Sequence, residues 1–179
     1  MFEQALKTVG FQFARLQFWS DIDTIQPMTQ FLRGAQNILV VLPLGYENAL
    51  LAGTAIRRHR DQLAQSHLTI VHSSTRATPL SEFPRSEVVR VDPPDINKFS
   101  LPKKSLMQRI MTRPYDVALD LNLDFVLHTA YICKASKAKV RVGFVNDSSE
   151  LFFNVLLNFD HTRPPQVVYE ACAASLAMF

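Results

Sequence analysis

The sequence has few of the residues that build metal centres and disulfide frameworks. It contains two cysteines, Cys133 and Cys172, and five histidines. Neither cysteine belongs to a CxxC pair or has a histidine at ligand spacing, and no two histidines stand four residues apart. We therefore expect no metal ion and two buried free thiols in a reducing compartment. The alternative is a metal site assembled from histidines that are far apart in the sequence.

Glycine is also scarce, and the motifs that depend on it are absent. None of the five glycines forms GxGxxG or GxxxxGK[ST], and no serine stands in GxSxG. Phosphate loops need such glycines to bring the backbone close to a phosphate, and the nucleophile elbow of a hydrolase needs them for its sharp turn. We therefore expect no cofactor, and no spacing in the sequence identifies an enzyme.

Strong charge and long apolar runs are missing too. The 19 basic and 16 acidic residues leave a formal charge of +3, which permits an anionic ligand but lacks the dense basic face of a nucleic-acid-binding protein. No apolar run approaches the roughly 18 residues of a membrane helix. The first residues also lack the layout of a signal peptide. We therefore expect a cytoplasmic protein without a transmembrane segment.

The most informative stretch runs from Asn37 to Leu51. An apolar run over Asn37–Pro43 is broken at Leu44–Asn48, and apolar residues then return at helical spacing over Ala49–Arg57. A strand that is apolar on both faces suits the centre of a parallel sheet covered by helices on both sides. Open α/β sheets bind ligands at the carboxyl ends of their strands, so the turn after this strand is the first place to seek a ligand.

The rest of the chain alternates between patterns typical of strands and of helices. Further strands are expected over His67–His72, Glu87–Val91, Asp116–Leu121 and Lys139–Phe144. Helices are expected over Leu106–Met111, Phe125–Lys134, Leu151–Leu157 and Gln166–Phe179, with a short one over Pro27–Leu32. This predicts an α/β fold with a doubly wound, mostly parallel sheet of about five strands in the order 3-2-1-4-5 and helices on both faces. We expect a single domain over residues 1–179, with a helical extension (1–36), an α/β core (37–160) and a final helix (164–179).

The first eighteen or so residues predict an amphipathic helix, weakened by a glycine at position 10. Its apolar stripe comprises Phe2, Leu6, Val9, Phe13 and Leu16. Three more aromatic residues, Phe11, Phe18 and Trp19, lie off that stripe, so we expect the helix to be covered on more than one side, by the domain or by a second subunit. Attachment to a membrane surface is the alternative, because Lys7 and Arg15 flank the apolar face.

The expected strand order puts the first and fourth strands side by side, which places a crevice between Leu44–Asn48 and Asn122–Asp124. Three carboxylates stand there: Glu47, Asp120 and Asp124. Two acids can divide the roles of general acid and base if their surroundings separate their pKa values. The alternatives are structural, since Asp120 can bond to the backbone at its strand end and Glu47 can oppose a helix dipole. The basic cluster Arg57–Arg60 also has two interpretations. It is either a phosphate-binding patch or a set of cations that favourably oppose the dipole at a helix C-terminus.

Four segments occur in an order and at spacings typical of a known family: Asn37–Leu51, Ala55–Arg57, Pro114–Asn122 and Ala138–Phe144. Over roughly Asn37 to Leu157 the chain resembles the N-terminal half of glycosyltransferase family 9, the heptosyltransferases of lipopolysaccharide core assembly. The more specific part joins Tyr115–Asn122 with Arg141–Phe144. The resemblance implies a Rossmann-like fold.

The resemblance also implies site residues. The family's Gly-Asp pair after the first strand, which supplies the acid thought to act as catalytic base, aligns with Glu47 and Asn48. An amide cannot take up a proton as a carboxylate does, so Glu47 is the candidate catalytic base. The family's Gln-Gly after the Asp-Leu strand is Asn122-Leu123 here. Ligand contacts are expected from Gly45, Tyr46, Asn48, Asn122, Asp124 and Arg141.

In that family the active site lies between two Rossmann-like halves, and the C-terminal half binds the nucleotide sugar. We therefore expect the donor site to be absent from this chain, which would make it a lone glycosyltransferase-like domain, non-catalytic by itself, that acts as a binding or assembly module. The first alternative is half of a split glycosyltransferase, with Glu47 as base and Arg57, Arg58 or Arg141 steadying an anionic acceptor. The second is an unrelated small-molecule-binding protein of the same fold. Expected partners are a second copy or a second Rossmann-like subunit, and a sugar or anionic small molecule.

Overall fold

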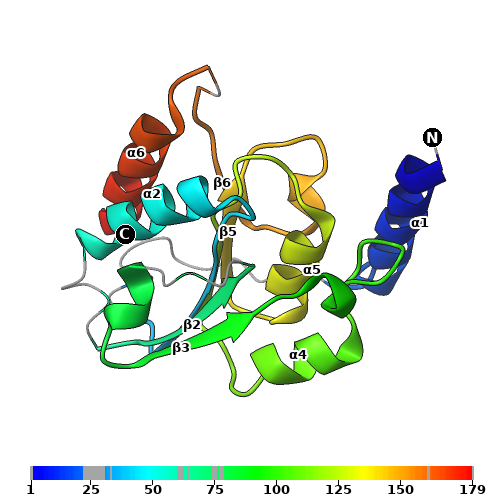
Figure 1. Cartoon of the computed structure of the whole chain (residues 1–179), viewed down its shortest axis with the longest axis horizontal. Helices are drawn as coiled ribbons and strands as arrows, with labels where there is room; N and C mark the ends of the chain where they lie inside the picture. The colour runs from blue at the N-terminus through cyan, green and yellow to red at the C-terminus, as the bar shows by residue number, and fades with distance from the viewer. Residues whose placement is uncertain are drawn as a thin grey trace.

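The computed structural model describes residues 2–21, 31–32, 34–59, 63, 65–73, 76, 79–160 and 162–178. Its centre is a six-stranded sheet in the order β3-β2-β1-β4-β5-β6, with every neighbouring pair parallel (Figure 1). The strands are β1 (Asn37–Val41), β2 (His67–His72), β3 (Ser86–Arg90), β4 (Val117–Asp120), β5 (Val140–Phe144) and β6 (Val155–Leu157). This is an α/β, Rossmann-like fold, and β1 and β4 lie side by side where the winding reverses.

Helices cover both faces of the sheet. The described helices are α1 (Phe2–Gln17), α2 (Tyr46–Arg57), α4 (Lys104–Ile110), α5 (Leu127–Ala135) and α6 (Pro165–Ala177). The pair α2 and α6 packs on one face, and α4 and α5 pack on the other, with α1 outside α5 at the edge of the molecule (Figure 1). No helix among the described ranges is both long and apolar enough to cross a membrane.

The central strand β1 is buried on both faces, as its apolar run predicts. Ile38 and Val40 point into the core under α2 and α6, whereas Leu39 and Val41 point into the core under α4 and α5. All four are at most 1% exposed. The alternation of side chains along a strand thus supplies both cores from one short segment.

The predicted strand order is confirmed, and β6 extends it beyond β5. The helix predicted over Leu151–Leu157 is wrong. A single 3₁₀ turn at Ser149–Leu151 leads into β6, whose backbone pairs with β5 from Val155 to Leu157. Phe152 and Phe153 are buried between these two elements. A short run that is apolar all round suits a buried strand and a buried helix equally, so periodicity alone does not separate them.

The predicted N-terminal helix is confirmed as α1, but its inward face is not the apolar stripe. Gly10, Ala14 and Phe18 are buried, while Val9 and Phe13 are exposed. The short helix predicted over Pro27–Leu32 lies largely outside the described residues. Cys133 and Cys172 are buried free thiols, and burial raises the pKa of both.

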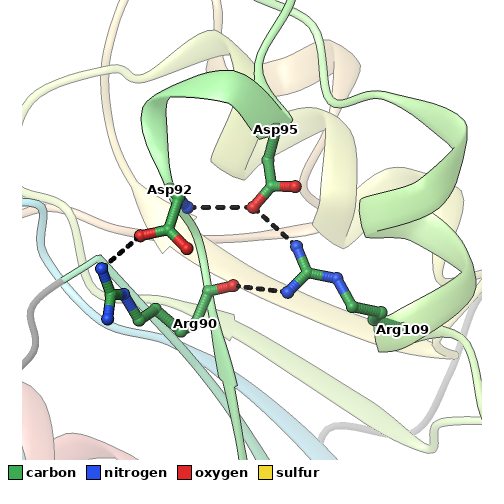
Figure 2. A network of polar contacts seen from close by, with 4 residues as sticks. All are labelled: Arg90, Asp92, Asp95 and Arg109. Atoms are coloured by element: carbon green, nitrogen blue, oxygen red, sulfur yellow. Dashed lines mark hydrogen bonds and ion pairs between the residues drawn. The ribbon is translucent and has the colours of Figure 1, made fainter.

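The irregular crossing that follows β3 is fixed by a polar network (Figure 2). Arg109 donates to an Asp95 carboxylate oxygen at 2.6 Å and to the Arg90 carbonyl oxygen at 3.1 Å. The same Asp95 oxygen accepts from the Asp92 backbone N–H at 2.9 Å, and Asp92 pairs with the Arg90 guanidinium at 2.6 Å. Burial alone would raise the pKa of Asp95, but the Asp92 amide and the Arg109 guanidinium bring it below its ordinary value.

Candidate functional site

The turn between β1 and α2 carries four of the predicted site residues: Gly45, Tyr46, Glu47 and Asn48. Gly45 precedes the helix with a φ of −76°, and a Cβ at this position would meet nothing within 4 Å. Neither the backbone angle nor crowding therefore requires glycine there, and the surface above it is open. Glu47 is exposed in the first turn of α2, where a negative charge suits the helix dipole.

A buried clamp joins the carboxyl ends of β1 and β4. The Asn122 side-chain oxygen accepts from the Leu44 backbone N–H at 3.2 Å. The Asn122 side-chain amide and backbone N–H both donate to one Asp120 carboxyl oxygen, at 2.7 and 3.0 Å. Asp120 and Asn122 thus hold the turn that carries the predicted site in place.

Asp120 is only 5% exposed, and this burial raises its pKa to about 6, although the bonds from Asn122 favour the charged form. The Thr129 hydroxyl lies 3.0 Å from the Val126 carbonyl oxygen, and its bond to Asp120 also favours the charged form of the carboxyl group. Burial therefore raises the pKa of Asp120 against the effect of the bonds from Asn122 and Thr129.

Two hollows flank the clamp. The first, which we call the β4–β5 hollow, has an empty volume of about 190 Å³, open to solvent, and is lined by polar residues that follow β4 and β5. These polar residues are Asp120, Asn122, Asp124, Asn146 and Ser149. The structure thus brings three predicted residues together here, with Asn146 and Ser149 added from the loop after β5. Glu47 does not line this hollow.

The second hollow, the β1–β2 hollow, has an empty volume of about 220 Å³ and lies at the carboxyl ends of β1 and β2. Its polar lining comes from His72, Ser73, His128 and Thr129, among apolar side chains such as Val71. Burial lowers the pKa of His128 to about 4, so its imidazole is neutral at pH 7.

His72 is the most distinctive residue of the β1–β2 hollow. It is 3% exposed, and its Nε2 lies 3.1 Å from the Arg76 carbonyl oxygen. A carbonyl only accepts, so Nε2 carries the proton, and in the neutral ring Nδ1 presents a lone pair. That buried Nδ1 has no hydrogen-bond partner within the described part of the chain. The Arg76 guanidinium also lies 4.6 Å from the centre of the Tyr46 ring, which links the hollow to the β1–α2 turn.

No pattern singled out in the sequence pointed to this second hollow. His72 ends β2, and β2 neighbours β1 in the predicted order, so the carboxyl end of β2 should have been searched together with those of β1 and β4. His128 and Thr129 carry no such signal, because they reach the hollow from the start of α5.

The structure separates the predicted arginines from the two hollows. Arg141 is buried in β5, where Nε donates to the Phe152 carbonyl oxygen at 2.9 Å and Nη1 to the Ala138 carbonyl oxygen at 2.8 Å. Arg57 pairs with Glu82 at 2.5 Å, and Arg58 pairs with Glu170 at 2.9 Å. A ligand role for Arg141 stays a prediction.

The motif residues that carry the family resemblance also have structural roles. The Tyr115 hydroxyl donates to the Ile110 carbonyl oxygen at 2.5 Å. Asp116 accepts from the Gln36 and Asn37 backbone N–H groups at 2.9 and 3.1 Å, which ties the amino ends of β1 and β4 together. These residues lie at the opposite ends of the strands from the two hollows. Within the described ranges, no group of three or more His, Cys, Asp or Glu side chains is arranged to hold a metal ion.

Several solved structures share this fold. The E. coli heptosyltransferase WaaC with ADP superposes with a TM-score of 0.60 at 15% identity, over 78% of this chain and 46% of that chain. The glycosyl transferase family 9 protein from Veillonella parvula DSM 2008 gives a TM-score of 0.58 at 15% identity, over 80% of this chain and 42% of that chain. The E. coli ADP-heptose lps heptosyltransferase II gives a TM-score of 0.58 at 16% identity, over 77% of this chain and 40% of that chain. At these identities the likeness concerns the fold, and this chain spans less than half the length of each of these proteins.

No curated protein matches the chain in sequence. A family model does match residues 81–170, which is just over half of the chain. The matched region runs from the turn before β3 into α6, and so it includes Asp120, Asn122 and the β4–β5 hollow. The chain belongs to the family described as Family of unknown function (DUF6913).

Proposed function

We propose that this chain is a glycosyltransferase-like domain that binds a small, uncharged polar ligand, such as a sugar, and does not catalyse glycosyl transfer by itself. The ligand lies over the carboxyl ends of β1, β2 and β4, where open α/β sheets bind their ligands. The likeness in fold to glycosyltransferase family 9 supports the ligand class, and the chemistry of the two hollows supports binding rather than catalysis.

The observation that carries the proposal is the buried Nδ1 of His72 in the β1–β2 hollow, for which the described residues provide no hydrogen-bond partner. Buried polar atoms in folded proteins nearly always have partners, so an exception calls for a functional reason. A lone pair on a nitrogen accepts a hydrogen bond from a hydroxyl or an amide N–H. The neighbouring Ser73 hydroxyl donates to the Leu44 carbonyl oxygen, which leaves its own oxygen free to accept as well. Acceptors at His72 and Ser73 favour a ligand that donates from hydroxyl groups.

Two further observations speak against catalysis by this domain alone. The carboxyl group at the strand ends, Asp120, is only 5% exposed and is bonded to Asn122 and Thr129, although it contributes to the lining of the β4–β5 hollow. Even when the open solvent above it is included, each hollow is smaller than the roughly 300–1,000 Å³ of typical small-molecule sites. Neither hollow therefore has room for a nucleotide sugar.

The proposal is tested by titrating the ¹⁵N-labelled chain with D-mannose and N-acetyl-D-glucosamine while recording amide shifts. We expect shifts at Ser73 and Thr129, and an affinity about tenfold weaker in His72→Phe, as the loss of one buried hydrogen bond predicts. His67→Phe is the matched control, because His67 is exposed at the other end of the same strand. Equal shifts in His72→Phe, or none with either sugar in the wild type, would refute the proposal. Strong binding heat in a calorimetric titration with ADP-glucose would also refute the proposal, because it would show that the chain binds a nucleotide sugar.

A second candidate function is half of a split glycosyltransferase, completed by a second Rossmann-like subunit. The observation that favours it is the exposure of Glu47 at the β1–α2 turn, where an acceptor hydroxyl can reach its carboxylate. Glu47 is then the general base. Glu47→Gln would abolish transfer by the reconstituted pair, and a fully active Glu47→Gln complex would rule out this role.

A further inference from the structure

The helix α1 is attached to the rest of the protein along one face. Gly10 lies so close to the chain at Phe99 that a Cβ there would clash with the Phe99 carbonyl oxygen. The Phe18 ring packs 5.1 Å from the Tyr131 ring, and the Tyr131 hydroxyl donates to the Gln17 side-chain oxygen at 2.9 Å. These contacts hold the glycine face of α1 against the protein and so fix the direction of its other face.

That other face carries large apolar side chains in contact with solvent. Val9 is 53% exposed, Phe13 58%, Leu16 74% and, just after the helix, Trp19 75%. Figure 1 shows α1 at the edge of the molecule, and the exposure of these side chains shows that no element among the described residues covers this side. Soluble proteins that act as monomers rarely leave such a contiguous apolar surface uncovered.

The spacing of these residues is that of a coiled-coil seam. Leu6, Val9, Phe13 and Leu16 are separated by three, four and three positions, which is the alternation of heptad positions a and d. An a/d seam fits the side of another α-helix, because each side chain enters a hole between residues of the facing helix.

The residues beside the seam favour a second copy of the chain over a lipid surface. The heptad positions beside the seam hold Ala5, Gly10, Gln12 and Gln17, which are all uncharged, so two identical seams meet without like-charge repulsion. Helices that lie on anionic membranes carry Lys or Arg along the polar border of their apolar face. Lys7 and Arg15 flank the apolar face of the whole helix, but they take heptad positions b and c and are therefore separated from the seam itself by these uncharged residues.

We propose that α1 is the dimerisation element of this protein. The seam formed by Leu6, Val9, Phe13 and Leu16 packs against the same seam of a second copy, and Trp19 extends the contact beyond the helix. The interface is isologous, so the same surface is used on both copies and the assembly closes as a dimer. This inference is independent of the proposed ligand site.

Light scattering and dilution of the full chain test it. We expect a mass of twice the 20.3 kDa of one chain. Trp19 is the only tryptophan, so acrylamide quenching of its fluorescence reports directly on the seam. Quenching should increase on dilution as the dimer dissociates. The variant Phe13→Glu/Leu16→Glu should dissociate at least about tenfold more readily. The matched control, Gln4→Glu/Arg15→Gln, changes the net charge equally outside the seam and should dimerise as the wild type does.

Several outcomes would overturn the proposal. The proposal is wrong if the wild-type chain stays monomeric at every concentration. It is also wrong if the Phe13→Glu/Leu16→Glu variant dimerises as well as the wild type. Protection of Trp19 from acrylamide only when vesicles of phosphatidylcholine and phosphatidylglycerol are added assigns the seam to lipid instead. Circular dichroism checks that the variants are folded. If the seam variant does not fold, the wild-type dilution series decides the question alone.

Discussion

Replacing Asp120 with asparagine should make the protein more stable above neutral pH. The side chain is buried in the clamp between β1 and β4, where burial raises its pKa from 3.8 to about 6. Asparagine has nearly the same shape and keeps an oxygen that accepts both bonds from Asn122.

The magnitude follows from the difference between the two pKa values. An acid whose pKa is raised on folding stabilises the fold fully below pH 3.8, and this contribution is lost as the pH rises toward 6. A shift of about two units corresponds to about 3 kcal/mol at 1.36 kcal/mol per unit. We therefore expect Asp120→Asn and wild type to be about equally stable at pH 4. At pH 8 the variant should have the larger free energy of unfolding, by about 3 kcal/mol.

Urea unfolding followed by far-ultraviolet circular dichroism between pH 4 and pH 8 measures this difference. Subtracting the two curves removes the contribution of every other titrating group. Asp124→Asn controls for the loss of one negative charge at the same hollow. If Asp120→Asn is the less stable protein at pH 8, the fold holds Asp120 as a stabilised carboxylate and the reasoning is refuted.

Three further substitutions test the packing and the loops. Gly143→Ala puts a Cβ 2.6 Å from the Phe153 ring, so it should lower the free energy of unfolding by about 1–3 kcal/mol, and Phe153→Leu in the same chain should recover part of the loss in urea unfolding. Asp95→Asn breaks the charged contact with Arg109 and should lower the free energy of unfolding by about 1 kcal/mol at pH 7. A carboxyl group whose pKa is lowered on folding stabilises the fold only where it is ionised, so this difference should disappear as the pH falls below the ordinary pKa of 3.8. Lys137 follows the C-cap of α5 and has a φ of 56°, a backbone conformation that glycine adopts more readily than lysine. Lys137→Gly should therefore raise the melting temperature, with an increase of about 1 kcal/mol in the free energy of unfolding, whereas Lys137→Ala should bring no increase.

The motifs that signal the family resemblance support the fold of this chain more than they support any activity. Tyr115 and Asp116 bond to backbone groups near the amino ends of the strands, and Arg141 bonds to the carbonyl oxygens of Phe152 and Ala138 in the segments that flank β5. Gly143 leaves room for a buried ring. Such residues build the Rossmann-like framework whatever ligand it binds, so their presence supports the fold and says little about a reaction.

The sequence by itself determined the framework. Residues 37–43 are apolar on both faces, and strand patterns alternate with helical ones; parallel strands joined by right-handed crossovers leave few arrangements, so the order β3-β2-β1-β4-β5 could be predicted. The same order located the turn at Gly45–Asn48 and the loop at Asn122–Asp124 at one edge of the sheet. These features depend on local periodicity and chain connectivity, which a single sequence contains.

Tertiary structure alone decided which side chains meet. Val9, Phe13 and Leu16 of α1 lie outward because the helix packs against the protein through the face that carries Gly10, where a Cβ would clash with the Phe99 carbonyl oxygen. Residues 155–157 form a strand because the edge of β5 offers partners for their backbone groups. His72 and His128 come from distant parts of the chain, and they share a hollow only because β2 ends beside the start of α5. Periodicity fixes the face on which a residue stands, but what that face meets depends on the packing of all the elements together.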